Sequence, residues 1–429
     1  MTRLTYYGVK NAMLVSTLVS NLIGVAIVRY FTQRSTLLLS PDIVRLAGQI
    51  EKFFLPASFL LPMALILVYE RPIRAYFSRR RGLGVASLSR AQAPGPYNAI
   101  TDVPGIEVGH YTEYESTGGS TGTTVVFARG GAVGGVTQRG GAPGTRETDL
   151  LKPENLVEIV NAVVLSGGSA YGLATADGVM ECLRNQGIGY PVGGGNVVPI
   201  VPAAILFDPG RCAPFDFRPD FSFGLQACLS VKGGPVEQEN IGAGAGARSG
   251  GGVKGGLGTA SVVLSNGIIV GAIVAVNSSG RTFDTNGNFY AAFLEMANEF
   301  HLPASAAASK DVLSLVKDDG LLRNTTIAVV ATNAKLSKAQ ATKVAQMADD
   351  GLARAIKPAH GVGDGDTVFA LATGTDTRDA SNLVSSIGSA AADTLSRAVV
   401  HAILAAKSIH VGTCNVRSYC EMYPVNCPH

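Results

Sequence analysis

The chain has 429 residues, of which 46% are hydrophobic and only 16% are charged. Its formal net charge of +3 is small, and no basic stripe runs through the glycine-rich body, so the composition argues against nucleic-acid binding. The 52 glycines follow no collagen period, which predicts tight turns and close backbone approaches rather than disorder.

The first 90 residues contain two uncharged apolar runs, 11–28 and 53–69. Each is close to the roughly 20 residues that cross a bilayer, so the pattern predicts a two-span membrane hairpin. The alternative is a pair of buried helices in a soluble N-terminal domain. Lys and Arg residues are more numerous outside the two runs than in the loop between them, which favours a membrane-anchored protein with a cytoplasmic catalytic domain. A linker is predicted at 87–95.

An apolar strand is predicted at 159–165, followed by Ser-Gly-Gly and a helix at 169–184. Ser169 and Tyr171 would then lie at a helix N-terminus, where free N–H groups can receive a carbonyl oxygen. This geometry favours a wall of a substrate pocket, with Tyr171 donating a hydrogen bond. The alternative is a plain strand-to-helix turn with Tyr171 packed in the core.

Two glycine loops, 192–196 and 241–252, precede Lys254. Neither ends in Gly-Lys-Ser/Thr, so a phosphate role is not favoured, and backbone passing close to a substrate or a partner subunit is the better hypothesis. Strands are predicted at 259–264 and 268–276, and Asn277 ends the second. A lysine can lower the pKa of a nearby hydroxyl, and an asparagine amide can stabilise an oxyanion. Otherwise Lys254 is a solvated side chain and Asn277 a turn residue.

Asn324-Thr325-Thr326 stands directly before the apolar run 327–331, after a predicted helix at 288–300. A threonine at the start of a buried strand can attack the carbonyl before it and, after hydrolysis, become a new N-terminus. Its α-amino group, with a reference pKa of roughly 7.7–8.0, would lie within reach of the hydroxyl as a base. The ordinary alternative is turn chemistry before a strand.

Asp364 and Asp366 follow the threonine by about forty residues in the motif Asp-Gly-Asp-Thr. Too few oxygen ligands follow for a calcium loop. A carboxylate beside an α-ammonium group would orient the nucleophile, as the third member of a triad orients its base. No partner is evident for the nearby His360, so it is not predicted to be the base.

A long helix is predicted at 383–407. The tail 408–429 holds Cys414, Cys420 and Cys427, whose spacing does not match a zinc module, so a flexible tail is expected. The other three cysteines, Cys182, Cys212 and Cys228, are expected to be buried thiols.

Six stretches in the same order resemble the family of L-aminopeptidase/D-esterases, β-peptidyl aminopeptidases and endo-type 6-aminohexanoate (nylon) oligomer hydrolases. They lie at 98–110, 165–172, 254–261, 270–277, 324–326 and 364–374. The resemblance covers about 98 to 407. It implies a four-layer α/β/β/α sandwich, no metal or cofactor, and tetramers of αβ units. By matching motifs it implies Thr325 as nucleophile, with Asn277, Lys254, Asp364 and Asp366 beside it.

The leading hypothesis has three segments: a hairpin and linker at 1–90, an amidohydrolase at 91–407 that cleaves itself between Asn324 and Thr325, and a cysteine-containing tail at 408–429. Its substrates would be short peptides, β-peptides or aminohexanoate-type oligomers and amides, and the Asn-Thr junction favours relatives of the nylon-oligomer hydrolases. One alternative is an acyl transferase resembling ornithine acetyltransferases, for which no acceptor motif is recognisable. Another is an unprocessed, membrane-anchored binding protein.

Overall fold

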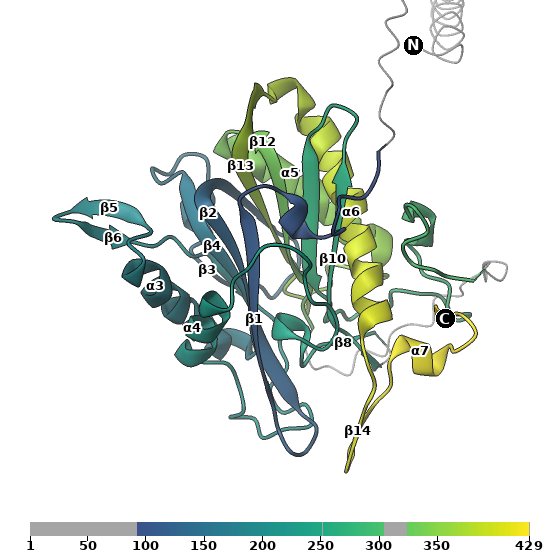
Figure 1. Cartoon of the computed structure of the whole chain (residues 1–429). Coiled ribbons are helices and arrows are strands. Elements are labelled where there is room, and N and C mark those ends of the chain that lie inside the picture. Colours follow the sequence, from purple (N-terminus) through teal and green to yellow (C-terminus); the bar gives the residue numbers. More distant parts are fainter. Residues whose placement is uncertain (1–91, 251, 304–323, 429) are drawn as a thin grey trace, which may run out of the picture. The chain divides into compact units, whose positions relative to one another are not determined.

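A computed structural model describes residues 92–250, 252–303 and 324–428, all within one compact unit, Arg90–His429 (Figure 1). Its centre is a mixed sheet of nine strands in the order β10-β11-β12-β13-β2-β4-β7-β3, with β1 paired to β2. The bounds are β1 Ile106–Tyr114, β2 Ser120–Gln138, β3 Gly144–Arg146, β4 Ile159–Ser166, β7 Ala203–Ile205, β10 Leu257–Val263, β11 Ile269–Ala275, β12 Ile327–Lys335 and β13 Thr367–Asp379. Neighbours are antiparallel except β12–β13 and β4–β7.

The long strand β2 takes part in two halves of this sheet. Its first part pairs with β1 and β4, whereas residues 133–138 pair with β13. The register against β4 shifts between Phe127 and Ala132, and Gly131 between them has φ +75°, a conformation that favours glycine. The irregularity allows the strand to bend and to join the two halves.

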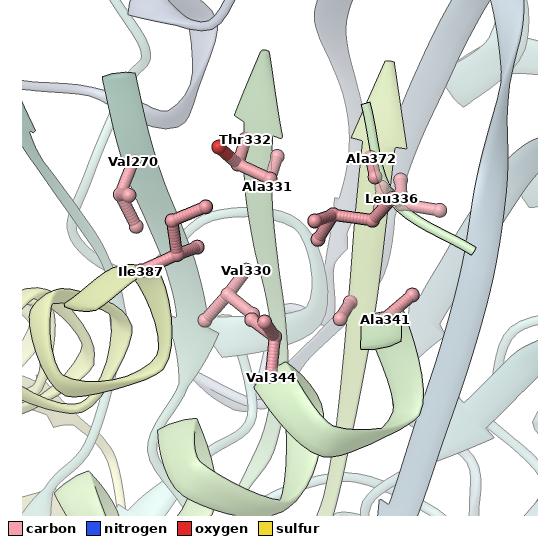
Figure 2. A pocket seen from close by; sticks show the side chains of 11 residues that line it. Val270, Val330, Ala331, Thr332, Leu336, Ala341, Val344, Ala372 and Ile387 are labelled. Atoms are coloured by element: carbon pink, nitrogen blue, oxygen red, sulfur yellow. The ribbon is translucent and has the colours of Figure 1, made fainter. Parts of the chain in front are cut away.

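Two helix pairs cover the strands, as Figure 1 shows on opposite sides of the sheet. They are α5 (Lys338–Ala355) with α6 (Val384–Ala405), and α3 (Thr175–Asn185) with α4 (Phe221–Leu229). One apolar cluster lies between the helices α5 and α6 and the strands β10–β13. A second lies between β11–β13 on one side and β1, β2 and β4 on the other. A third lies between the strands β2 and β4 and the helices α3 and α4. Figure 2 shows the first cluster where Val330 and Val344 meet; the space there has no room for a water molecule.

Residue alternation explains why β12 is central. Ala328 and Val330 contribute to the cluster under α5 and α6, whereas Ile327 and Val329 contribute to the cluster between the strands. Because side chains alternate along a strand, an all-apolar strand can bury both faces.

The helix predicted at 383–407 is confirmed as α6, and the helix predicted at 169–184 is confirmed only from Thr175 onward, after a 3₁₀ turn at Ser169–Ala174. The helix predicted at 288–300 is wrong. That segment forms turns and a single 3₁₀ turn, Ala292–Leu294, and both Ala297 and Asn298 have positive φ, which ends a right-handed helix.

The predicted membrane anchoring with a cytoplasmic catalytic domain is corrected. In the part of the chain that the structure describes, no helix combines the length and apolar character needed to cross a membrane. The two runs on which the prediction rested, 11–28 and 53–69, lie outside the described residues.

The expectations of buried thiols and a flexible tail are also wrong. All six cysteines are paired, as Cys182–Cys228, Cys212–Cys414 and Cys420–Cys427. The tail forms a hairpin of β14 (Ile409–Val411) and β15 (Cys414–Val416), then the short helix α7 (Tyr419–Met422). Tyr419 is buried among aromatic rings, so apolar packing holds the tail to the body.

Candidate active site

Strand pairing brings the predicted site residues together. Thr325 stands just before β12, and Asp364 and Asp366 stand just before its parallel neighbour β13, so both segments enter the sheet at the same edge. Asn277 follows the end of β11, which is antiparallel to β12 and pairs Ala275 with Ile327. Three segments far apart in the chain therefore converge at one edge of the sheet.

The peptide bond between Asn324 and Thr325 is held from several directions. The Thr325 hydroxyl donates to the Asn324 carbonyl oxygen at 2.5 Å, and the Thr325 N–H donates to the Asn277 carbonyl at 2.6 Å. The Gly365 N–H lies 3.2 Å from both the Asn324 carbonyl oxygen and the Thr325 hydroxyl oxygen. Thr325 is only 5% exposed, so a hydroxyl, its own carbonyl and a backbone donor meet where water is largely excluded.

Asp364 anchors the residue before the threonine. Its carboxylate accepts from the Ser279 hydroxyl at 2.7 Å and from the Gly361 N–H at 3.0 Å. The Asn324 side-chain amide in turn donates to Ser279 Oγ at 3.0 Å. Burial raises the pKa of Asp364 against the opposing effect of the Ser279 hydrogen bond.

Asp366 holds the next peptide unit and a histidine. It accepts from the Thr326 N–H at 2.7 Å, and its other oxygen lies 3.0 Å from His360 Nδ1. His360 Nε2 is 3.7 Å from the buried carboxylate of Asp349. Burial lowers the pKa of His360, but the Asp366 hydrogen bond and the two negative charges outweigh burial and raise it. The sequence showed no partner for His360, whereas the structure places two carboxylates beside it, Asp366 of the Asp-Gly-Asp motif and Asp349 of α5.

The Asn277 amide has a fixed orientation. Its Oδ1 accepts from the Arg248 N–H at 3.0 Å and from the Arg211 guanidinium, and its Nδ2 donates to the Phe207 carbonyl at 3.3 Å. Because two N–H groups donate to one end of the amide, that end is the oxygen, and the NH₂ group at the other end is free to act as a donor only. Arg211 also reaches the Asn324 Oδ1 at 3.5 Å. Nothing in the sequence marked Arg211, which lies in a loop without a recognisable motif.

Lys254 lies deeper than expected. Its ammonium group donates to the carbonyls of Gly244, Ala247 and Gly255 at 2.6–3.1 Å, and no contact with Thr325 is seen within the described residues. Burial, together with the charges of Arg211 and Arg248, lowers its pKa to about 7. A lysine so buried can lose its proton near neutral pH.

Ser169 and Tyr171 make contacts other than the predicted ones. Ser169 has φ +54° and donates its N–H to the Leu206 carbonyl at 2.9 Å. Tyr171 is 55% exposed and its ring lies 3.9 Å from the Arg218 guanidinium carbon. Among the described residues, no hydrogen bond joins either side chain to Thr325.

Asp208 is a buried carboxylate that sequence reasoning missed. It accepts from the Gly168 N–H and the Thr121 hydroxyl, both at 2.7 Å, and burial raises its pKa. A Cβ on Gly167 would lie 2.2 Å from its Oδ2, so the Ser-Gly-Gly turn is glycine because Asp208 occupies that space. Within the residues that the structure describes, no three His, Cys, Asp or Glu side chains are grouped to hold a metal ion.

Comparison with solved structures identifies the class of fold. An L-aminopeptidase D-Ala-esterase/amidase from Ochrobactrum anthropi, described as a variant of the Ntn (N-terminal nucleophile) hydrolase fold, matches with a TM-score of 0.60 at 21% identity, over 78% of this chain and 96% of its own. A Burkholderia β-aminopeptidase matches with a TM-score of 0.58 at 24% identity, over 77% and 93%. The chain therefore has an Ntn-hydrolase-like α/β fold.

The chain belongs to peptidase family S58, whose family model matches residues 98–416. An uncharacterized aminopeptidase of Mycobacterium leprae is 45% identical over 77% of this chain and 95% of its own length. A 6-aminohexanoate-oligomer endohydrolase of a Kocuria strain is 29% identical over 70% and 88%. The resemblance deduced from the motifs is confirmed, and the chain is an amide-bond hydrolase of the peptidase type.

Proposed function

We propose that this protein is a self-processing N-terminal threonine amidohydrolase. It would cleave its own chain between Asn324 and Thr325 and then hydrolyse amide bonds with Thr325 as nucleophile. One observation carries the proposal: the Thr325 hydroxyl contacts the carbonyl oxygen of its own preceding residue, and the Gly365 N–H lies within hydrogen-bond distance of both.

Processing begins when the Thr325 oxygen attacks the Asn324 carbonyl carbon. The hydroxyl proton passes to the Thr325 nitrogen, which becomes the leaving amine, and the negative charge that develops on the carbonyl oxygen is stabilised by the Gly365 N–H. The C–N bond then breaks, and an ester joins Asn324 to the threonine oxygen. Water hydrolyses this ester and leaves a carboxylate on Asn324 and a free amine and hydroxyl on Thr325.

The mature site would repeat the same chemistry on a substrate amide. The new α-amino group, beside the Asn277 carbonyl, would take the hydroxyl proton as the threonine attacks the substrate. Asn277 Nδ2 and the Gly365 N–H would stabilise the oxyanion. Asp364 and Asp366 would fix the two segments on either side of the nucleophile. Lys254 is proposed to stabilise the negative charge that develops in the reaction. Ser169 and Tyr171 are proposed to bind the substrate.

The acyl side of the substrate would occupy the place that Asn324 holds before processing. There Ser279 and Arg211 both hydrogen-bond with the polar side chain of Asn324. Asp364 in turn holds the Ser279 hydroxyl. Short peptides, β-peptides and aminohexanoate-type oligomers all present polar groups to such a site. We propose these as the substrate classes. We also propose an α/β/β/α layering of the fold, which the three apolar clusters support. The mature enzyme is proposed to form tetramers of αβ units.

Mass spectrometry of the purified protein, with amidase assays, tests this function. Wild type should give two fragments, the smaller beginning Thr-Thr-Ile-Ala-Val. Thr325→Ala should remain one chain without amidase activity, and Thr325→Ser should process in part. Thr326→Val is the matched control. It removes the neighbouring hydroxyl, which has no hydrogen-bond partner among the described residues, at nearly constant volume, and it should process normally.

Two results would contradict the proposal. They are cleavage of Thr325→Ala at this junction, and hydrolysis of amides by a wild-type chain that stays whole. Transfer of the acyl group to an added amine in preference to water would indicate the acyl transferase instead.

A further inference from the structure

One of the three disulfides crosses the proposed cleavage site. Cys182 and Cys228 both precede Asn324, and Cys420 and Cys427 both follow Thr325, so each of those bonds lies within one product chain. Cys212–Cys414 joins a residue of the first chain to a residue of the second across 202 positions. A role for this bond in linking two chains rests on the proposed self-processing.

The bond also lies beside the candidate active site. Cys212 directly follows Arg211, whose guanidinium donates to the Asn277 Oδ1. The Arg248 guanidinium, on the segment that also donates its N–H to Asn277, lies 3.3 Å from Cys212 Sγ. The Cys212 carbonyl accepts from the Thr117 hydroxyl at 2.6 Å, and its backbone has φ +60°. A residue held in this left-handed conformation depends on its surroundings to stay there.

The other cysteine belongs to the C-terminal hairpin, which closes this region from outside. Ile409 and Val416 of β14 and β15 line a cavity of about 10 Å³ together with Arg211, Cys212 and Lys254. The Lys254 N–H donates to the Arg417 carbonyl at 2.8 Å.

The β1–β2 loop packs tightly against the same hairpin. A Cβ on Gly118 of that loop would lie 2.8 Å from Val411 Cβ and 3.2 Å from Cys414 Cβ. The hairpin is therefore seated directly on the loop, with no space for a layer of water between them.

We propose that Cys212–Cys414 covalently joins the two chains of the mature enzyme and holds Arg211 against Asn277. Arg211, Cys212 and Cys414 are thus positioning residues: they act through the amide of Asn277, which they keep with its NH₂ group as the donor. The second chain supplies the nucleophile and also, through Cys414, secures the loop of the first chain that orients the oxyanion donor.

Loss of the bond should lower kcat more than it raises KM, because an oxyanion donor acts mainly in the transition state. A misplacement on the order of 1 Å costs up to about 10²-fold in rate, so Cys414→Ser should reduce kcat by roughly tenfold to a hundredfold. Arg211→Met should reduce kcat similarly while the disulfide remains. Arg211→Lys, which keeps one donor but not the planar fork, should recover part of the loss.

Denaturing electrophoresis of the full chain tests the covalent link. Processed wild type should run as one species without reductant and as two with dithiothreitol, which reduces the disulfide to two thiols. Cys414→Ser should run as two species in both conditions. The double variants Cys182→Ser/Cys228→Ser and Cys420→Ser/Cys427→Ser are matched controls and should still run as one species without reductant.

The outcomes separate this proposal from the processing on which it rests. If wild type stays one species after reduction, self-cleavage has failed, and a disulfide-linked peptide containing Cys212 and Cys414 in a tryptic digest then decides the bond. Two wild-type chains that separate without reductant would overturn the link. If Cys414→Ser runs as two species on the denaturing gel and yet has the kcat of wild type, the positioning role is overturned. If Cys414→Ser does not fold, dithiothreitol treatment of the folded variant that lacks the other four cysteines, in which Cys212–Cys414 is the one disulfide left, gives the same comparison, with circular dichroism to verify the fold.

Discussion

Gly365 lies where the scissile bond, the nucleophile and the Asp-Gly-Asp segment meet. Its N–H lies 3.2 Å from both the Asn324 carbonyl oxygen and the Thr325 hydroxyl oxygen. A Cβ at this position would lie 2.8 Å from the Thr325 hydroxyl oxygen and 2.6 Å from the Ala142 carbonyl oxygen. The residue is therefore glycine because of close approach, since its φ does not lie in the left-handed region.

Gly365→Ala should slow self-processing by roughly 10²-fold, because the new methyl group displaces the nucleophile from its carbonyl. The rate can be followed by mass spectrometry after expression of the precursor. Gly130→Ala is the control, since a Cβ there has no described atom within 4 Å. Equal processing rates for the two variants would show that this close approach does not matter.

The pair of Asp349 and His360 should make stability depend on pH. Burial raises the pKa of Asp349 from 3.8 to about 6, so the native state keeps a proton that the unfolded state releases in this range, and stability falls as pH rises through it. The pKa of His360 is raised above 6.5, so its stabilising contribution is present below that pH and is lost as pH rises through the folded-state pKa. Arg139 and Asp366 also face this pair.

Asp349→Asn should flatten the loss of stability between pH 4 and 6, because asparagine has no proton to release, and should leave much of the loss above pH 6.5. Urea unfolding midpoints from pH 4 to 8 measure this. Asp177→Asn, an exposed carboxylate on α3 paired with Arg146, should keep the wild-type profile. The interpretation fails if both variants have the same profile as wild type.

At the scale of elements, α5 and α6 pack closely through a glycine. A Cβ on Gly351 of α5 would lie 2.3 Å from the Ala392 carbonyl oxygen of α6. Both helices cover β10–β13. The candidate active site forms at the ends of three of these strands, β11, β12 and β13. The spacing of this helix pair therefore fixes the layer behind the nucleophile.

Gly351→Ala should lower the free energy of unfolding by roughly 1–2 kcal/mol, although alanine is the better helix former by about 1 kcal/mol, because overpacking against a backbone carbonyl outweighs propensity. Denaturant unfolding measures the change. Gln346→Ala, exposed on the same helix, should stay within about 0.5 kcal/mol of wild type. A stabilised Gly351→Ala would show that the helices can separate at little cost.

At the scale of the whole molecule, the two proposed product chains share one sheet. β12 and β13 come from the second chain and lie between β11 and β2 of the first. β12 and β13 pair with each other, and α5 and α6 of the same chain cover one of their faces. Their outer backbone edges pair with β11 and β2, and their other apolar face packs against strands of the first chain.

Processed Cys414→Ser should therefore remain one particle under native conditions, although its chains separate in denaturant. Residues 325–429 expressed alone should not fold, because both neighbours of their central strands are missing. Size-exclusion chromatography with light scattering tests the first statement, and circular dichroism with thermal unfolding tests the second. A cooperative unfolding transition of the isolated fragment would contradict this view.

The sequence by itself determined the features that depend on neighbours along the chain. The continuous apolar run after Thr325 predicts β12, helical spacing predicts α6, and the ordered motifs identify the family. The resemblance implied that Asn277, Asp364 and Asp366 lie beside Thr325, and tertiary structure alone decided which contacts these and other groups make. Sheet register places Asn277 and Gly365 at the Thr325 bond, α5 brings Asp349 to His360, and folding pairs all six cysteines. The helix predicted at 288–300 failed for the same physical reason: apolar spacing reports burial, while the contacts that terminate or replace a helix come from residues that local pattern does not describe.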